Sequence, residues 1–465
     1  MDAFEHELMR RSPLASAVLD ICDFIFDDKL LKSIWEADRG RCYEDTLKFR
    51  DFLRMMRDAL IRYGGSAHKL YLELESRGAQ PVDESNFYGK LKRTPVELSR
   101  ALLRECTQRL SSLLPAPVVQ LPGCFAGFEV MAGDGKVIKN ATKRLKPTRG
   151  YIGKMLGAKA LVALNLRSGL AVAMSDSLDG MTNDVPLVPL LIPQLYEVVG
   201  ERPLLTVWDR QFDDLRTLGL LSQREGDAFL VRMKETKLTF AAESTVKSRD
   251  AQGRQVLDEI GLLSSSKRSM RVRRITLFRT GEGEDNVVLL TNLLDRGRYA
   301  TADLLELYRY RWHIEQVFQQ VTETFSLSHL IGCAPKAVLL QFSFCLLLYN
   351  LMQVVKAYVA EDGQVLASMV SMHYLFADVR TELVAWAYHT GGSWPRTCRD
   401  AAEMCRRLRT LLRGCWDPIK YTKARDKKPR GKPKPKQWLH GGHTSVQRAL
   451  EGRARVTRRA KVVVR

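Results

Sequence analysis

The first 115 residues carry the apolar spacing of amphipathic helices. Apolar residues recur every three to four positions around residues 15–37, 46–63 and 95–114. This period matches the turn of an α-helix, whereas an alternation of apolar and polar residues, typical of strands, does not occur there. The pattern therefore predicts an α-helical N-terminal region.

A helix, a tight turn and a second helix are predicted inside this region. Asp83 or Ser85 begins the first helix, and Thr94 with Pro95 supplies the N-cap and first turn of the second. The segment is basic, which is equally consistent with contact to a DNA backbone and with a solvated helix face. Its three cations are Lys90, Lys92 and Arg93.

From about residue 124 the pattern changes to short apolar runs typical of strands. The runs GFEVMAG, AKALVALNL and GLAVAMSDSL are followed by a helical stretch from Asp184 to Val199 and by the buried-strand pattern PLLTVW. Three strands, a helix and a further strand indicate an α/β core with a mixed sheet. After another strand, DAFLVRMK, about 65 polar residues with the runs MRVRRITLFRT and DNVVLLTNLL predict a β-rich insertion.

Helical periodicity returns at Thr301, a candidate N-cap, and continues through DLLELYRYRWHIEQVFQQVTETF. At 100° per residue, a polar stripe of Tyr308, Arg311, Glu315 and Thr322 borders the apolar face of this helix. An ordinary intrahelical ion pair between Arg311 and Glu315 is one explanation, and a functional site is the other. The apolar face consists of Leu307, Ile314, Val317, Phe318 and Val321, and His313 lies away from the stripe in a structural position.

The run AVLLQFSFCLLLYNLMQVV at residues 337–355 is long enough to span a membrane. It contains Gln341, Ser343, Asn350 and Gln353, and the chain has no second run of this kind. We therefore expect a buried helix and no membrane association.

Charge adds a polyanionic partner to this picture. The 465 residues hold 73 Lys and Arg against 53 Asp and Glu, a net charge of +20. Residues 420–465 contain 16 of the cations and only two acids, Asp426 and Glu451. Prolines interrupt this tail and no apolar stripe accompanies its charges, which favours nucleic acid over a membrane surface.

The nine cysteines are scattered singly, without a Cys-x-x-Cys pair, and the N-terminus lacks the apolar region of a signal peptide. Both features predict a reduced, cytoplasmic setting. His440 and His443 have a metal-like spacing, but two histidines in a polar tail are a weak candidate for a metal site.

Three acids follow elements that can bring them together. Asp134 and Asp209 each end a predicted strand, and Glu315 lies on the helix after the insertion. Oxygen ligands of this kind suit Mg²⁺ or Mn²⁺, and two such ions promote displacement at a phosphodiester. For each Asp, a role in a turn or a helix cap is the alternative.

Other acids are weaker candidates for this site. Asp213 and Asp214 could replace Asp209, although a position at a helix start is the simpler explanation. Asp176, Asp179 and Asp184 are expected to belong to a loop.

Over most of residues 80–355 the chain resembles a DDE transposase of the insertion-sequence-4 type. Tyr308, Arg311 and Glu315 fit the Tyr-x2-Arg-x3-Glu spacing of that family's motif. Asp134-Gly135 and Asp209-Arg210-Gln211-Phe212 resemble the elements that carry its first and second acids. The family also places a β insertion between the second and third acids.

The resemblance implies a function and roles for the site residues. The three acids would hold two Mg²⁺ or Mn²⁺ ions, and Tyr308, Arg311 and Arg210 would contact DNA, with the first two at terminal phosphates. In the family's motif the Glu is followed, after six intervening residues, by a Lys. At that position this chain has Thr322. Candidate replacements are Lys336, Lys267 and Arg271.

The fold expected is α/β, with an RNase H-like mixed sheet core that contains a β-rich insertion. An α-helical N-terminal domain precedes the core, and a C-terminal helical region and a basic, disordered tail follow it. The predicted parts are a DNA-contacting helical domain (1–120), the first part of the core (121–233), the insertion (234–300), the last part of the core (301–356), the C-terminal helices (357–419) and the tail (420–465).

The function expected is a DNA transposase that cleaves the ends of its mobile element and joins the 3′-hydroxyl to target DNA. Its partners would be the element ends, the target DNA and a second copy of the chain, in the bacterial cytoplasm and nucleoid. The alternatives are a metal-dependent nuclease without strand transfer and a DNA-binding protein whose catalytic site has decayed.

Overall fold

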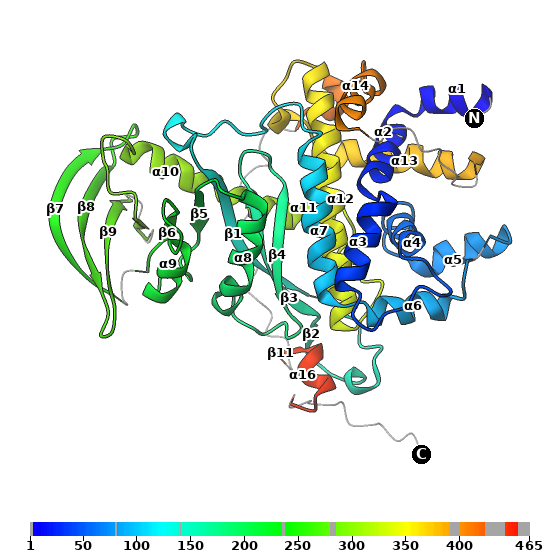
Figure 1. The fold of residues 1–465 in the computed structure, drawn as a ribbon, viewed down its shortest axis with the longest axis horizontal. Helices are drawn as coiled ribbons and strands as arrows, with labels where there is room; N and C mark the ends of the chain where they lie inside the picture. Colours follow the sequence, from blue (N-terminus) through cyan, green and yellow to red (C-terminus); the bar gives the residue numbers. More distant parts are fainter. Residues whose placement is uncertain are drawn as a thin grey trace.

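Helices gather at one end of the molecule, a curved group of strands forms the other end, and a mixed sheet lies between them (Figure 1). The computed structural model describes residues 3–79, 81–139, 141–234, 238–279, 285–390, 400–423 and 442–453. The N-terminal helices are α1 (Ala3–Arg11), α2 (Pro13–Ile25), α3 (Asp28–Asp38), α4 (Phe49–Ile61), α5 (Ala67–Ser76), α6 (Glu84–Arg93) and α7 (Val96–Ser111).

Two details of the N-terminal helices differ from the sequence predictions. The helix expected over 15–37 is divided, because Asp27 caps α3 by accepting hydrogen bonds from the backbone N–H groups of Lys29 and Leu30. Lys90 is not available to a phosphate, since its ammonium is buried, lies over the Trp35 ring and donates to the carbonyl of Leu47. Lys92 remains exposed.

Nine of the described strands form one sheet in the order β4-β3-β1-β5-β6-β10-β9-β8-β7, and the other two, β2 (Lys154–Leu156) and β11 (His443–Ser445), form a separate pair. Strand β1 is antiparallel to β3 and parallel to β5, and β5 is parallel to β6. All other neighbours are antiparallel. The strands are β1 (Glu129–Ile138), β3 (Ala158–Asn165), β4 (Ala171–Ser177), β5 (Leu204–Trp208), β6 (Ala228–Arg232), β7 (Thr239–Arg249), β8 (Gln255–Ser264), β9 (Ser269–Leu277) and β10 (Val287–Thr291).

The β-rich insertion continues the core sheet. Strand β10 pairs with β6 of the core, and β9, β8 and β7 follow in turn. Arg273 on β9 is fully buried and donates to both carboxylate oxygens of Asp258 on β8. Thr301 also donates to Asp258, at 2.6 Å, so its side chain is used here. The N-cap of α10 is Ala300 and not Thr301 as predicted.

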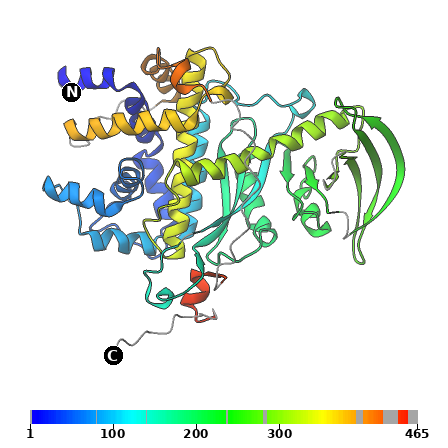
Figure 2. The same cartoon turned by 180° about the vertical axis from the view of Figure 1, so that it is seen from behind.

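Helices cover both faces of the core sheet. Helix α8 (Val188–Val199) packs on β3 and β4, whereas α11 (Trp312–Glu323) packs on β1 on the opposite face (Figures 1 and 2). The helix predicted to start at Thr301 is interrupted: α10 (Thr301–Tyr310) ends before Arg311. There the N–H of Arg311 bonds to the carbonyl of Tyr308 at 3.2 Å, a tighter turn than that of an α-helix.

The apolar run at 337–355 lies in α12 (Pro335–Asp362), as predicted. Of the described helices, α12 alone has the length and apolarity of a membrane span, and its most apolar window is entirely buried. It packs against α7, α6 and α2 as well as β3 and β4. The remaining elements include α9 (Leu215–Leu221), α13 (Met372–Thr390), α14 (Ala401–Leu411), α15 (Pro418–Tyr421), β2 (Lys154–Leu156), β11 (His443–Ser445) and α16 (Val446–Leu450).

The prediction that residues 420–465 form one disordered tail is wrong for the part of it that the structure describes. Strand β11 pairs in parallel with β2, and Ser445 and Val446 are buried. Arg448 of α16 binds Asp179 at 2.7 Å. Backbone pairing and burial thus order residues 442–453, although the local sequence shows little apolar periodicity. Residues 424–441 and 454–465 lie outside the described residues.

Candidate active site

Asp134 and Asp209 lie side by side on neighbouring parallel strands. Gly133 of β1 pairs with Trp208, the last residue of β5, so each acid is the next residue along the chain. Asp209 directly follows β5 as predicted, whereas Asp134 lies inside β1, which continues to Ile138 and does not end at the acid. A Cβ atom at position 133 would approach the Trp208 ring to 2.0 Å, which explains the glycine there. The Trp208 ring in turn contacts Phe212, with ring centroids 4.7 Å apart.

Helix α11 carries Glu315 toward the two aspartates. Tyr308 at the end of α10 and Arg311 in the turn between the helices connect Glu315 to them. Arg311 donates to Glu315 Oε1 at 2.9 Å, and its Nη1 atom lies 4.0 Å from Asp134 Oδ2. The Tyr308 hydroxyl donates to Asp209 Oδ1 at 3.4 Å. The structure therefore places Asp134, Glu315 and Tyr308 around the buried Arg311 guanidinium, and Tyr308 links Asp209 to this group.

The site carries an excess of negative charge. Burial raises the pKa of Asp134 to about 6, the N–H of Gly135 and the Arg311 guanidinium oppose this increase, and the neighbouring carboxylates of Glu315 and Asp184 add to it. The Nε and Nη1 atoms of Arg311 are buried without a hydrogen-bond acceptor. A cation at the carboxylates and an anion at Arg311 would each satisfy an uncompensated group.

Asp184, Lys159 and Gln211 adjoin the site, an arrangement that the sequence patterns do not indicate. A Cβ atom at Gly135 would meet the Asp184 carboxylate at 2.0 Å. The Lys159 ammonium lies 2.5 Å from Asp184 Oδ1, and Gln211 donates to Oδ2 at 2.6 Å. Asp184 was expected to be an ordinary loop residue, and only the pairing of β1 with β3 brings Lys159 to it.

Lys136 extends the site along β1. Successive side chains of a strand alternate between its faces, so Lys136 shares the face of Asp134. Burial lowers the pKa of the Lys136 ammonium, while Asp134 and Glu323 act in the opposite direction. No pattern in the sequence marks this lysine as a site residue.

The other candidate acids have structural partners. Asp214 caps α9 through the N–H groups of Arg216 and Thr217, and Asp213 accepts from the N–H of Lys234 at 2.9 Å. Neither aspartate is therefore needed as a substitute for Asp209. Of the remaining candidates, Asp176 pairs with Arg100, Asp179 pairs with Arg448, and Arg210 is exposed 4.0 Å from Asp285.

The histidines do not form a metal site in the described part of the chain. Burial lowers the pKa of His313, and its ring contacts Tyr310 at 5.6 Å between centroids. His443 is exposed on β11, and His440 lies outside the described residues.

Among the described residues, no three His, Cys, Asp or Glu side chains are close enough together to hold a metal ion. At the acids this follows from Arg311, which stands between Glu315 and Asp134. The donor set nevertheless suits a hard divalent cation, because it offers only carboxylate oxygens and because burial of Asp134 disfavours its charged form unless a cation is near.

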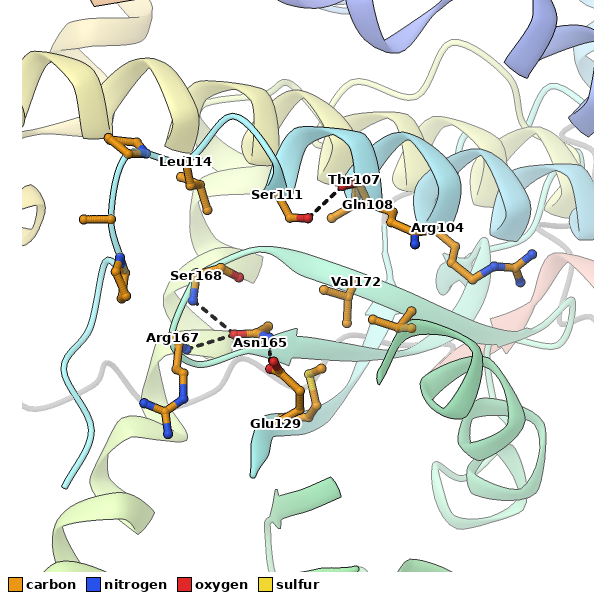
Figure 3. Close-up of a pocket in the computed structure, with 15 residues that line it drawn as sticks. Arg104, Thr107, Gln108, Ser111, Leu114, Glu129, Asn165, Arg167, Ser168 and Val172 are labelled. Carbon is orange, nitrogen blue, oxygen red and sulfur yellow. Dashed lines mark hydrogen bonds between the residues drawn. The ribbon is translucent and has the colours of Figure 1, made fainter. Parts of the chain in front are cut away.

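A cavity of about 440 Å³ lies elsewhere, between α7 and the amino end of β1 (Figure 3). It includes Glu129, five residues before Asp134, which places it roughly 17 Å along the strand from the acids. The Glu129 carboxylate accepts from the Asn165 side chain at 2.8 Å, and the side-chain Oδ1 of Asn165 accepts from the N–H groups of Arg167 and Ser168. These polar groups satisfy one another.

The part of the chain that contains the three acids is similar to known proteins. Residues 127–351 match the family model described as a transposase DDE domain. The chain is 29 % identical over 136 residues to "Putative transposase y4zB" of Sinorhizobium fredii. This alignment covers 28 % of the chain and 37 % of the relative, so the chain spans little more than a third of the relative's length.

Among solved structures, the chain is weakly similar to the cryo-EM structure of the piggyBac transposase synaptic complex with hairpin DNA. The two chains are 11 % identical, with a TM-score of 0.37, over 90 % of this chain and 87 % of that one. The family match contains Asp134, Asp209 and Glu315. The family model and the curated relative thus both show that this chain is similar to transposases.

Proposed function

We propose that the protein is a DNA transposase of the insertion-sequence-4 type, which cleaves the ends of its element and joins the freed 3′-hydroxyl to target DNA. The observation that carries this proposal is the convergence of Asp134, Asp209 and Glu315 on Arg311 and Tyr308 inside the matched domain. A solvated helix face would not require a buried arginine between carboxylates.

The core is proposed to be RNase H-like. The strand order β4-β3-β1-β5-β6, with β3 antiparallel to its neighbours and β1, β5 and β6 parallel, supports this assignment. The first two acids then occupy adjacent positions, Asp134 within β1 just beyond its last pair with β5 and Asp209 directly after β5.

The three acids would hold one or two divalent ions, Mg²⁺ or Mn²⁺. When bound, such ions activate a water or a 3′-hydroxyl and stabilise the leaving oxygen of the phosphodiester. Glu315 would exchange its partner Arg311 for an ion, and the guanidinium would then be free to bind a phosphate. Gly135 fixes Asp134 through its N–H group, and Tyr308 fixes Asp209.

Arg311 and Tyr308 are suited to contact the terminal phosphates of the element end. Two nitrogens of Arg311 are buried donors without acceptors, and an arginine can bind a phosphate with two parallel hydrogen bonds. Tyr308 adds a neutral donor beside it. Arg210, exposed next to Asp209, would contact the DNA backbone further from the reacting bond.

The proposed partners are the element ends, the target DNA and a second copy of the chain, because two ends must be joined in one reaction. The net charge of +20 favours binding to this polyanion. The proposed setting is the bacterial cytoplasm, at the nucleoid.

The deciding experiment is a cleavage and strand-transfer assay with DNA that carries the sequences flanking the gene. Wild-type protein and Glu315→Gln are compared with Mg²⁺, with Mn²⁺ and with EDTA. We expect cleavage and joined products from the wild type only, and only with a metal. Cleavage without joined products would indicate a nuclease, and metal-independent binding without cleavage would indicate a decayed site.

A further inference from the structure

Lys136 places a cation at the edge of the acid site. It lies two residues after Asp134 on β1, on the strand face that packs against α11. Its Nζ atom donates to the carbonyl of Phe318 at 3.5 Å and lies 5.5 Å from the centre of the Phe318 ring. Phe318 follows Glu315 by one helical turn, so Lys136 lies beside the acids along both elements.

Position 322 meets Lys136 at the same atom. The Thr322 hydroxyl donates to the Phe318 carbonyl at 2.6 Å, and Lys136 donates to that oxygen from the facing strand. A side chain from α11 and one from β1 thus converge on a single carbonyl. Thr322 supplies no charge, so the positive charge at this place comes from β1.

Lys136 differs from the other cations of the site in its partners. Arg311 is bound to Glu315, and Lys159 is bound to Asp184. Among the described residues, Lys136 has no carboxylate within ion-pair distance, and its contact with Phe318 occupies only one of the three ammonium donors. The remaining donors are available to an anion.

The replacements considered from the sequence alone are less suitable. Lys336 is exposed near the start of α12, and Lys267 is exposed in the turn between β8 and β9. Arg271 binds Glu243 at 2.9 Å on the outer strands.

We propose that Lys136 binds a backbone phosphate of the DNA end beside the reacting bond, from the strand that carries the first acid. This inference rests on the proposed function, because it takes the phosphodiester at the acids as the substrate. The ammonium would act as a positioning group: it would neutralise a phosphate one nucleotide or so from the ions and fix the strand over Asp134.

The test uses four full-length variants. Lys136→Met removes the charge and keeps the apolar stem against Phe318, and Lys136→Arg keeps the charge. Lys136→Met combined with Thr322→Lys returns an ammonium to the same carbonyl from α11. Lys139→Met, an exposed lysine on the same chain segment, is the matched control.

Two quantities are measured: the rate of cleavage and joining, and the Kd for pre-cleaved end DNA in Ca²⁺ with the Glu315→Gln change present. We expect Lys136→Met to lower the rate by about 10- to 100-fold and to weaken end binding by about 5- to 10-fold, with the melting temperature unchanged. Lys136→Arg and the double variant should recover most of both quantities, and Lys139→Met should match the wild type.

A rate and a Kd for Lys136→Met within twofold of the wild type would overturn the role of Lys136 and leave the proposed function intact. Failure of the double variant to recover either quantity would show that an ammonium at position 322 does not reach the phosphate bound by Lys136, and would overturn the inference that the two positions serve the same phosphate. Absence of cleavage by the wild type would overturn the proposed function, and this inference with it.

Discussion

At the scale of single residues, the three acids are expected to act together. Asp134→Asn, Asp209→Asn and Glu315→Gln should each lower cleavage by about 10³-fold or more, because each removes a charge that holds the ions. Binding to end DNA, measured by fluorescence anisotropy, should change little. Asp214→Asn is the matched control, since its side chain can still cap α9. Cleavage near the wild-type rate by any of the three variants would remove that residue from the ion site.

Arg311 and Tyr308 should affect the cleaved end more than overall DNA affinity. Arg311→Ala leaves Glu315 without its partner and removes two buried donors, and Tyr308→Phe removes the hydrogen bond to Asp209. We expect both to weaken binding of pre-cleaved ends by about tenfold, with little change in the dependence of log Kd on log salt. A uniform loss of affinity for random DNA would instead assign this helix to a general backbone tract.

The sequence was sufficient to propose the residues that share a motif but not those that meet only in three dimensions. Asp134, Asp209, Tyr308, Arg311 and Glu315 have informative neighbours or helical spacing, and the structure brings them together. Lys136, Lys159 and Asp184 have no local signal. Their places depend on the pairing of β1 with β3 and on the packing of α11, which one-dimensional spacing does not contain.

At the scale of elements, the close contact of β1 and β5 fixes the distance between the first two acids. Gly133→Ala would place a methyl group 2.0 Å from the Trp208 ring. We expect a loss of stability of about 1–3 kcal/mol from this overpacking. We also expect a large loss of cleavage, because Asp134 and Asp209 are displaced. Gly127→Ala, where a Cβ meets nothing within 4 Å, is the control for both measurements.

The start of α2 should make stability depend on pH. Glu382 of α13 accepts a hydrogen bond from the N–H of Ala15 at 2.8 Å, and burial raises its pKa to about 7. A raised folded-state pKa favours the protonated acid, so its contribution is complete below pH 4.5 and is lost as the pH rises through 7. Glu382→Gln should flatten the urea unfolding free energy between pH 5 and 8, by at most about 3 kcal/mol. An unchanged pH profile would contradict this assignment.

The types of most elements could be predicted, but their limits and partners could not. Apolar period identified the helices near 46–63 and 95–114 and the strands of the core, all of which the structure confirms. The apolar period shows neither the local turn at Arg311 nor the pairing of β10 with β6. The apolar period predicts strands in the insertion, but it does not show whether they form a separate sheet or extend the core sheet.

At the scale of the whole molecule, the distribution of charge should determine nonspecific binding. Residues 454–465 contain five Lys or Arg and no acid. Ending the chain after Arg453 keeps the β11–β2 pairing and removes these charges. We expect the slope of log affinity against log salt to become shallower by up to about 4, with discrimination between ends and random DNA unchanged.

Filter binding at several salt concentrations measures both quantities for the full and shortened chains. Equal slopes would place these residues outside the DNA interface. A loss of end discrimination would show that they read bases.

The shared position of α12 has a consequence for how such a protein can evolve. One helix packs against α2, α6 and α7 on the N-terminal side and against β3, β4 and α11 on the other. If the N-terminal helices were exchanged for those of a distant relative, they would no longer fit the surface of the 28-residue helix α12. Exchange of the strands beyond β10 would disturb one sheet edge and the hydrogen bonds of Asp258 and Arg273 to the start of α10. New variants of this architecture should therefore arise by replacement of the outer strands, while the helical half and the catalytic half are inherited as a unit.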